Sequence, residues 1–127
     1  MQICRDLTLK EGAIFIADAH YLPSRDELTG FLELLLERAD KPPQLFLMGD
    51  IFDFLSPYVP YSVEKNQKPI NLINTLSLEV ETVIFEGNHD FNLLSLFPNA
   101  IVIPRRNQPF IVEQKEVSIS LSPRDID

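Results

Sequence analysis

Three short, largely apolar runs, each ending abruptly in polar residues, most constrain how this chain folds. They cover residues 13–17, 45–48 and 83–86. Apolar runs of this length are typical of strands that are buried on both faces of a parallel sheet. The polar residues that follow such strands gather at one edge, where open α/β sheets carry their sites. The sequence therefore predicts an α/β fold with a site at the carboxyl edge of its sheet.

The segments between the runs predict the helices that connect parallel strands. Residues 24–27 have the Ser-x-x-Glu form of a capping box, and apolar residues follow at helical spacing until two prolines block continuation. We therefore expect a helix over residues 26–40. A second helix is expected over residues 69–78, with Pro69 in its first turn. A strand–helix–strand unit crosses over right-handed, which makes its two strands parallel.

The remaining segments predict less regular structure. Residues 1–11 read as a polar lead-in, and residues 54–61, which contain two prolines, fit neither helical nor strand spacing. The aromatic and apolar residues of that second segment either line an apolar pocket or pack in the ordinary way. A short helical turn over residues 91–97 and three short strands over residues 100–103, 109–112 and 117–121 are expected to follow. The last strand has no helix after it to cover its edge, so we expect an incomplete sequence.

Composition narrows the class of protein. The chain has 127 residues, of which 45% are hydrophobic, so residues 1–127 are expected to form a single domain with its own core. Its net charge of -8 gives no basic surface for nucleic acid, and no nucleic-acid partner is expected. The single cysteine, Cys4, cannot form an internal disulfide, and no signal peptide or membrane span is recognisable. We expect a cytoplasmic protein, with peripheral contact to the inner membrane left open.

The polar residues at the ends of the three runs form a metal-binding set. Asp18 and His20 follow the first run, Asp50 the second and Asn88 the third. Mixed oxygen and nitrogen donors suit Mn, Fe or Zn. Asp50 is the natural bridge, because the two oxygens of a carboxylate can bind two cations that together hold a phosphate. Taken singly, each of these residues has a structural interpretation, and His20 alone would more often be an ordinary buried or surface residue.

Two further residues are candidates for catalysis. His89 directly follows the predicted ligand Asn88, so it can face the substrate as a proton donor or as a cation near the phosphate. Asp90 can orient the imidazole of His89. Asp53, three residues after Asp50, is expected to support the ligands.

Three motifs carry a family resemblance: Asp18-x-His20, Gly49-Asp50-x-x-Asp53 and Gly87-Asn88-His89-Asp90. They resemble the first three signature blocks of the calcineurin-like metallophosphoesterases. The resemblance implies a layered α/β sandwich and a hydrolase of phosphoester or pyrophosphate bonds with two divalent metal ions, Mn foremost. It also implies that the positions matching Asp18, His20, Asp50 and Asn88 bind metal and that the one matching His89 assists catalysis.

Residues 15–36 are also similar to UDP-2,3-diacylglucosamine hydrolases of lipid A synthesis, although those enzymes usually have Arg at the position of His89. The expected substrate is therefore a phosphorylated small molecule or a lipid-linked phosphate. The family continues with a His-Gly-Asp and then a Gly-His-x-His block. This chain has Pro123-Arg124-Asp125 at the first of these and lacks the second. We therefore expect the N-terminal part of the domain, namely the first sheet with its covering helices, and an incomplete second metal site.

These departures lead to one prediction and leave two alternatives. The prediction is that the 127-residue chain is a poor catalyst and self-associates, as a homodimer for example, through uncovered apolar surface. One alternative is a degenerate or fragmentary member that acts as a binding or assembly module. The other is a receiver-like signalling domain with Asp50 as phosphoacceptor, which would need an acidic pair after its first strand and a lysine after its last.

Overall fold

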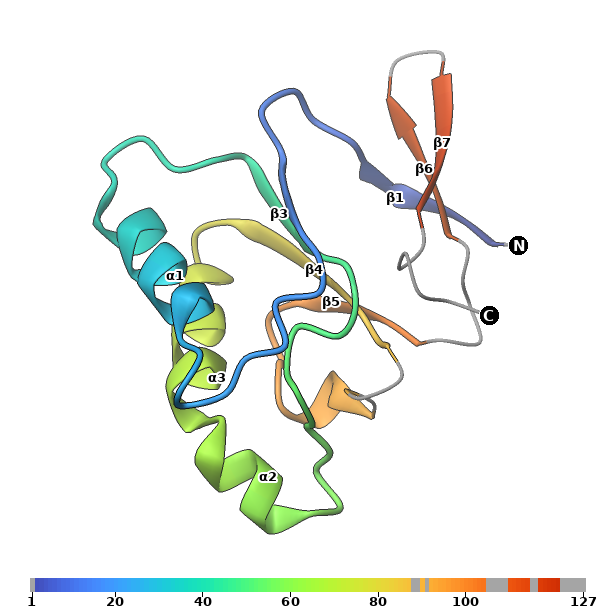
Figure 1. Ribbon diagram of the computed structural model, residues 1–127. Coiled ribbons are helices and arrows are strands. Elements are labelled where there is room, and N and C mark those ends of the chain that lie inside the picture. The colour runs from blue at the N-terminus through green and yellow to red at the C-terminus, as the bar shows by residue number, and fades with distance from the viewer. Residues whose placement is uncertain (1, 88–89, 91, 105–109, 115–116, 122–127) are drawn as a thin grey trace.

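The computed structural model describes residues 2–87, 90, 92–104, 110–114 and 117–121, which form an α/β fold with two sheets (Figure 1). The larger sheet has four parallel strands in the order β2-β3-β4-β5. Its strands are β2 (Ile14–Ile16), β3 (Gln44–Leu47), β4 (Glu81–Phe85) and β5 (Ile101–Ile103). The three predicted apolar runs thus form neighbouring parallel strands, and their carboxyl ends meet at one edge as expected.

The smaller sheet contains β1 (Gln2–Thr8), β6 (Phe110–Gln114) and β7 (Val117–Leu121) in the order β1-β6-β7. β1 pairs parallel with β6, and β6 pairs antiparallel with β7. Figure 1 shows this sheet beside the larger one, on the side away from the long helices. The prediction of an irregular lead-in over residues 1–11 was wrong for β1. This strand forms by pairing with a segment more than 100 residues away, as in the pair Gln2 and Phe110, which local sequence does not reveal.

Helix α1 (Glu27–Glu37) confirms the first predicted helix, but its ends differ from the expectation. Its N-cap is Asp26, which makes no side-chain capping bond, and its C-cap Arg38 is already extended with ψ 133°. The predicted capping box is wrong because Ser24 lies inside a tight turn. In that turn the Arg25 N–H donates to the Leu22 carbonyl at 2.8 Å. A turn therefore ends where the helix begins.

The second predicted helix, over residues 69–78, is confirmed by helix α3 (Gln67–Leu76), and a helix that the sequence did not predict precedes it. This preceding helix is α2 (Pro60–Lys65), so the expected loop over residues 54–61 already becomes helical at Pro60. Polar side chains fix this segment. The Ser62 hydroxyl accepts the Ser56 N–H at 3.1 Å, and the Asn66 amide donates to the Phe54 carbonyl at 2.9 Å. Helix α2 is thus held by polar side chains that bond to the backbone, and such bonds leave no periodic apolar pattern in the sequence. This helix was therefore not predicted. A short 3-10 helix, η1 (Leu93–Ser95), follows β4.

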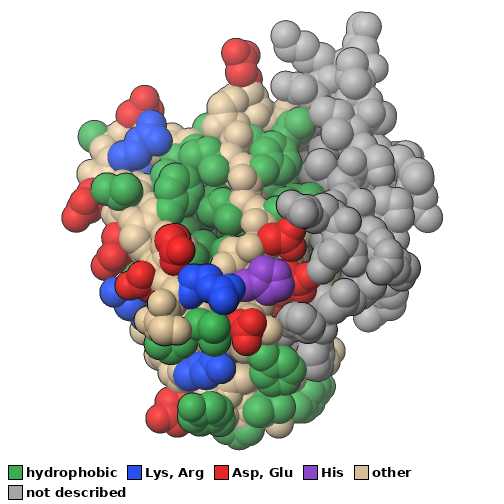
Figure 2. Space-filling view, in the orientation of Figure 1, with side chains coloured by type: hydrophobic (Ala, Val, Ile, Leu, Met, Phe, Trp, Pro, Cys, Tyr) green, Lys and Arg blue, Asp and Glu red, His purple; other side chains and the backbone are tan. Residues whose placement is uncertain are grey.

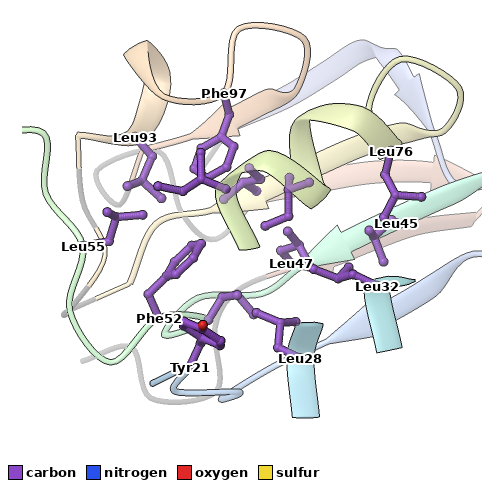
Figure 3. Close-up of a cluster of buried hydrophobic side chains, with 14 of the residues drawn as sticks. Tyr21, Leu28, Leu32, Leu45, Leu47, Phe52, Leu55, Leu76, Leu93 and Phe97 are labelled. Carbon is purple, nitrogen blue, oxygen red and sulfur yellow. The ribbon is translucent and has the colours of Figure 1, made fainter. Parts of the chain in front are cut away.

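Both faces of the larger sheet are buried at its central strands, β3 and β4. The side chains of Leu45 and Leu47 pack against α1 and α3 in the main core, which Figure 3 shows in close-up. The alternate residues Phe46 and Met48 belong to a second hydrophobic cluster on the opposite face. Leu9, which directly follows β1, packs against this cluster. Alternation of this kind explains the uninterrupted apolar run of β3.

The main core extends past the end of β3 into the loop that carries the predicted site. The side chains of Phe52 and Leu55 are fully buried, and the ring of Phe52 stacks on that of Phe97 with centroids 6.2 Å apart (Figure 3). The loop after β3 is therefore anchored by apolar packing on the side away from its polar residues. None of the helices in the described part of the chain has the length and apolar character needed to span a bilayer.

Candidate metal centre

The loops after β2 and β3 continue side by side beyond the ends of their strands. The N–H of Asp18 donates to the Gly49 carbonyl at 3.4 Å, that of His20 to the Asp50 carbonyl at 3.0 Å, and that of Tyr21 to the Ile51 carbonyl at 2.8 Å. These bonds prolong the parallel pairing by several residues. They hold the two loops in one register, so the side chains of the first two motifs are brought together by backbone contacts.

The three predicted ligands on these loops all have left-handed backbones. The φ angles are 54° at Asp18, 45° at His20 and 49° at Asp50, and Gly49 before Asp50 has φ 93°. A left-handed conformation costs a residue with a side chain about 1–2 kcal/mol, so it persists only where the surrounding contacts impose it. Such strain is concentrated at functional sites. Here the left-handed residues bend the two loops just after β2 and β3 end. The side chains of Asp18, His20 and Asp50 thereby meet at a common point.

The ligand atoms of Asp18, His20 and Asp50 converge. One carboxylate oxygen or imidazole nitrogen from each residue lies within 4.8 Å of those of the other two. His20 Nε2 is 3.8 Å from Asp18 Oδ1, and Figure 2 shows acidic side chains beside the histidine on this face. Asp50 is fully buried, whereas Asp18 and His20 are half-buried. Two carboxylates and one imidazole at this spacing are compatible with a divalent cation, as predicted for these residues.

Asp90 is a buried carboxylate that binds backbone amides from both neighbouring loops. Its Oδ1 accepts the N–H of Gly87 at 2.8 Å and that of Asp50 at 3.2 Å. Its Oδ2 accepts the N–H of Ile51 at 2.7 Å and that of Phe52 at 3.3 Å. Burial raises the pKa of Asp90 to about 7, against the opposing effect of these four donors. These contacts were not predicted from the sequence, which indicated only that Asp90 could orient His89.

At Gly87 the loop after β4 passes close to Asp50. A Cβ atom at this position would lie 2.6 Å from both the backbone nitrogen and Oδ1 of Asp50, and 3.0 Å from Oδ1 of Asp90. The absence of a side chain is therefore what allows the loop to pass beside Asp50. From the sequence, Gly87 had no assigned role beyond its place in the Gly-Asn-His-Asp motif. The Gly-Asn-His-Asp pattern could have marked it, since close backbone approach is one of the uses of glycine after a strand.

The other predicted site residues have different outcomes. Asn88 and His89 lie outside the described residues, so the second metal position, the proton donor and the orientation of His89 by Asp90 stay predictions. Asp53 is half-buried and its N–H donates to the Tyr21 carbonyl at 3.1 Å, which adds one more bond between the loops. Its carboxylate is not part of the converging group, and its supporting role stays a prediction.

A cavity of about 480 Å³ lies among the segments that follow β3 and β4. Tyr58, Glu86 and Asn92 are among its lining residues, together with prolines and aliphatic side chains. Residues 54–61 were expected either to line an apolar pocket or to pack in the ordinary way. Tyr58 lines this cavity, and Leu55 is buried in the core. The segment thus combines both interpretations.

No protein-family model matches this sequence, and no curated protein matches it.

Proposed function

We propose that this chain carries a metal centre that hydrolyses phosphoester or pyrophosphate bonds with two divalent cations. The observation that carries the proposal is the convergence of Asp18, His20 and Asp50 within 4.8 Å at the carboxyl edge of a parallel sheet. The order and spacing of the three motifs, which resemble those of calcineurin-like metallophosphoesterases, supply the reaction type. We further propose that the two sheets form the first part of the layered α/β sandwich of that family.

Each residue of the centre has a proposed task. Asp18, His20 and Asp50 hold one cation, and Asp50 and Asn88 hold the other, so that the Asp50 carboxylate serves both. When bound, such cations neutralise the charge of a phosphoryl group and make water a better nucleophile. His89 donates a proton to the leaving group or stabilises charge near the phosphate. With a net charge of -8, the chain depends on cations to attract an anionic substrate.

We propose Mn²⁺ as the metal, with Fe or Zn as alternatives, and a phosphorylated small molecule or a lipid-linked phosphate as the substrate. We also propose that the chain self-associates. Several large apolar side chains support this, since Tyr58, Tyr61 and Leu94 are 78%, 71% and 67% exposed. A cytoplasmic location with peripheral contact to the inner membrane completes the proposal.

The proposal is tested by metal titration and hydrolysis with the same samples. Mn²⁺ binding to the full chain is measured by calorimetry, and bis(p-nitrophenyl) phosphate is the hydrolysis probe. We expect Asp50→Asn and His20→Gln to weaken Mn²⁺ binding by about tenfold or more, because each removes a direct ligand. The matched control is Glu33→Gln, whose exposed carboxylate lies 3.9 Å from Lys68 Nζ and outside the centre.

The results separate the candidate functions. Slow hydrolysis that requires Mn²⁺ and disappears in Asp50→Asn supports the phosphoesterase. Mn²⁺ binding at this centre without any turnover favours the binding or assembly module. Binding that is absent, or equal in all four proteins, contradicts the proposed metal centre.

A further inference from the structure

The strongest unexplained feature is the density of hydrogen bonds on the Asp90 carboxylate. It accepts the N–H groups of three consecutive residues, Asp50, Ile51 and Phe52, and also that of Gly87. Asp90 is 1% exposed, so this carboxylate cannot reach a substrate in the solvent. Its contacts are made with the backbone of the loops that carry the predicted metal ligands.

The Asp50 backbone needs such a contact. Asp50 is left-handed with φ 49°, directly after Gly49 with φ 93°, so two successive residues depart from ordinary strand geometry. The N–H of Asp50 donates to Asp90 Oδ1, while its carbonyl accepts the His20 N–H at 3.0 Å. Both peptide groups of Asp50 are thereby fixed. One is tied to the loop after β2 and the other to the loop after β4.

The local arrangement explains why a carboxylate occupies this position. Successive N–H groups in a turn that contains left-handed residues form a concave anion site. Here the three N–H groups of residues 50–52 point at one buried carboxyl group that the chain itself provides. Asp90 also binds Gly87 twice, since the Gly87 N–H is 2.8 Å from Oδ1 and 3.1 Å from the Asp90 carbonyl oxygen. The same side chain therefore closes its own loop and holds the neighbouring one.

We propose that Asp90 is a positioning residue of the metal centre: it holds the strained backbone of Asp50 so that the Asp50 carboxylate meets Asp18 and His20. This inference deepens the proposed function and rests on it for the identity of the bound group. Groups that orient metal ligands through hydrogen bonds typically change metal affinity by about 10–100-fold when they are replaced. Asp90→Asn is therefore expected to weaken Mn²⁺ binding by about tenfold or more, because its NH₂ group would face backbone N–H donors.

The hydrogen bonds are tested first in the wild-type chain without metal. Scalar coupling across a hydrogen bond, between the Ile51 backbone ¹⁵N and the Asp90 ¹³Cγ, is expected in the NMR spectrum. Slow exchange of the amide protons of residues 50–52 is expected as well, with faster exchange in Asp90→Asn. The coupling and the slow exchange in the wild type need neither a variant that folds nor a bound cation.

Metal affinity is then compared with that of a variant that is destabilised elsewhere. Ser62→Ala removes a buried hydroxyl that bonds to Ser56 and Val59, farther along the loop after β3, so it lowers stability without removing any hydrogen bond between Asp90 and residues 50–52. At a temperature where all chains are folded, Ser62→Ala is expected to bind Mn²⁺ as the wild type does and Asp90→Asn much more weakly. A purely structural role for Asp90 would lower Mn²⁺ affinity equally in both variants or in neither.

Each outcome has a separate meaning. Absence of the coupling together with rapid exchange in the wild type overturns the positioning role whatever the metal does. Wild-type binding of Mn²⁺ that Asp90→Asn leaves unchanged overturns the positioning role alone. Failure of the wild type to bind Mn²⁺, with the coupling present, overturns the proposed function and with it the metal-positioning role.

Discussion

Gly87→Ala is the sharpest perturbation of the contact between the loops after β3 and β4. The added Cβ would lie 2.6 Å from the Asp50 backbone nitrogen and 2.6 Å from Asp50 Oδ1. Favourable contacts between such atoms lie at about 3.5–4.0 Å, so the two loops must separate by roughly 1 Å. The atoms in the way include backbone on a strand-anchored loop, which cannot rotate aside as the end of a long side chain can.

The cost follows from what this separation breaks. Forcing a methyl group into a packed site costs about 1–3 kcal/mol. A shift of this size also weakens the buried hydrogen bonds of Asp90 to Gly87 and Asp50, and leaving a buried partner unsatisfied costs about 1–3 kcal/mol. We therefore expect Gly87→Ala to lower the free energy of unfolding by about 2–6 kcal/mol. Mn²⁺ affinity should fall as well, since Asp50 Oδ1 is displaced.

Gly30→Ala is the matched control. Gly30 lies within α1, and a Cβ there would meet nothing within 4 Å. Alanine in a helix interior is more favourable than glycine by about 0.5–1 kcal/mol, so this variant should be slightly more stable than the wild type. The two changes add the same methyl group and have opposite expected signs.

The assay is urea unfolding of the three chains without metal, followed by calorimetric Mn²⁺ titration of those that are folded. The expected order of stability is Gly30→Ala, then wild type, then Gly87→Ala. Equal stability of Gly87→Ala and the wild type, with unchanged Mn²⁺ affinity, would show that the loops do not approach each other as described.

Three further predictions concern individual side chains. Asp50→Ala should remove more Mn²⁺ than any other single change, because both cations share this residue, and equal loss in Asp53→Ala would refute the bridging role. In a protein that has the complete site, His89→Ala should lower the turnover number by about 100-fold or more with the metal content retained, and loss of metal in parallel would make His89 a ligand instead. Because burial raises the pKa of Asp90 from 3.8 to about 7, the folded chain keeps this proton where the unfolded chain has lost it. Stability without metal should thus fall as pH rises across that interval and then level off, and an equally steep fall in Asp90→Asn would contradict this assignment.

The parts of the fold that the sequence predicted are those with strong local patterns. The runs that became β3 and β4 are apolar because both faces of the sheet are covered there, whereas Phe15 in β2 is 46% exposed. Helix α1 has a regular apolar stripe. Parallel strands joined by helices place their carboxyl ends together, so the convergence of Asp18, His20 and Asp50 followed from the order of the elements.

What the sequence could not predict depends on contacts between distant segments. β1 exists through pairing with β6, and α2 begins where Ser62 and Asn66 bind the preceding loop. The role of Asp90 depends on the N–H groups of residues about 40 positions earlier, whose directions are set by left-handed residues. An aspartate that binds backbone N–H groups cannot be told from one that binds a metal ion by its residue type. The sequence alone therefore does not distinguish the role of Asp90 from that of Asp50.

The most direct test of the metal centre is a crystal structure of the full chain grown with Mn²⁺, analysed by anomalous scattering. We predict a Mn²⁺ peak bonded to the Asp18 carboxylate, the His20 imidazole and the Asp50 carboxylate, with Asp90 still bound to the N–H groups of residues 50–52. A Mn²⁺ ion bound elsewhere, with these three side chains directed away from one another, would contradict the account.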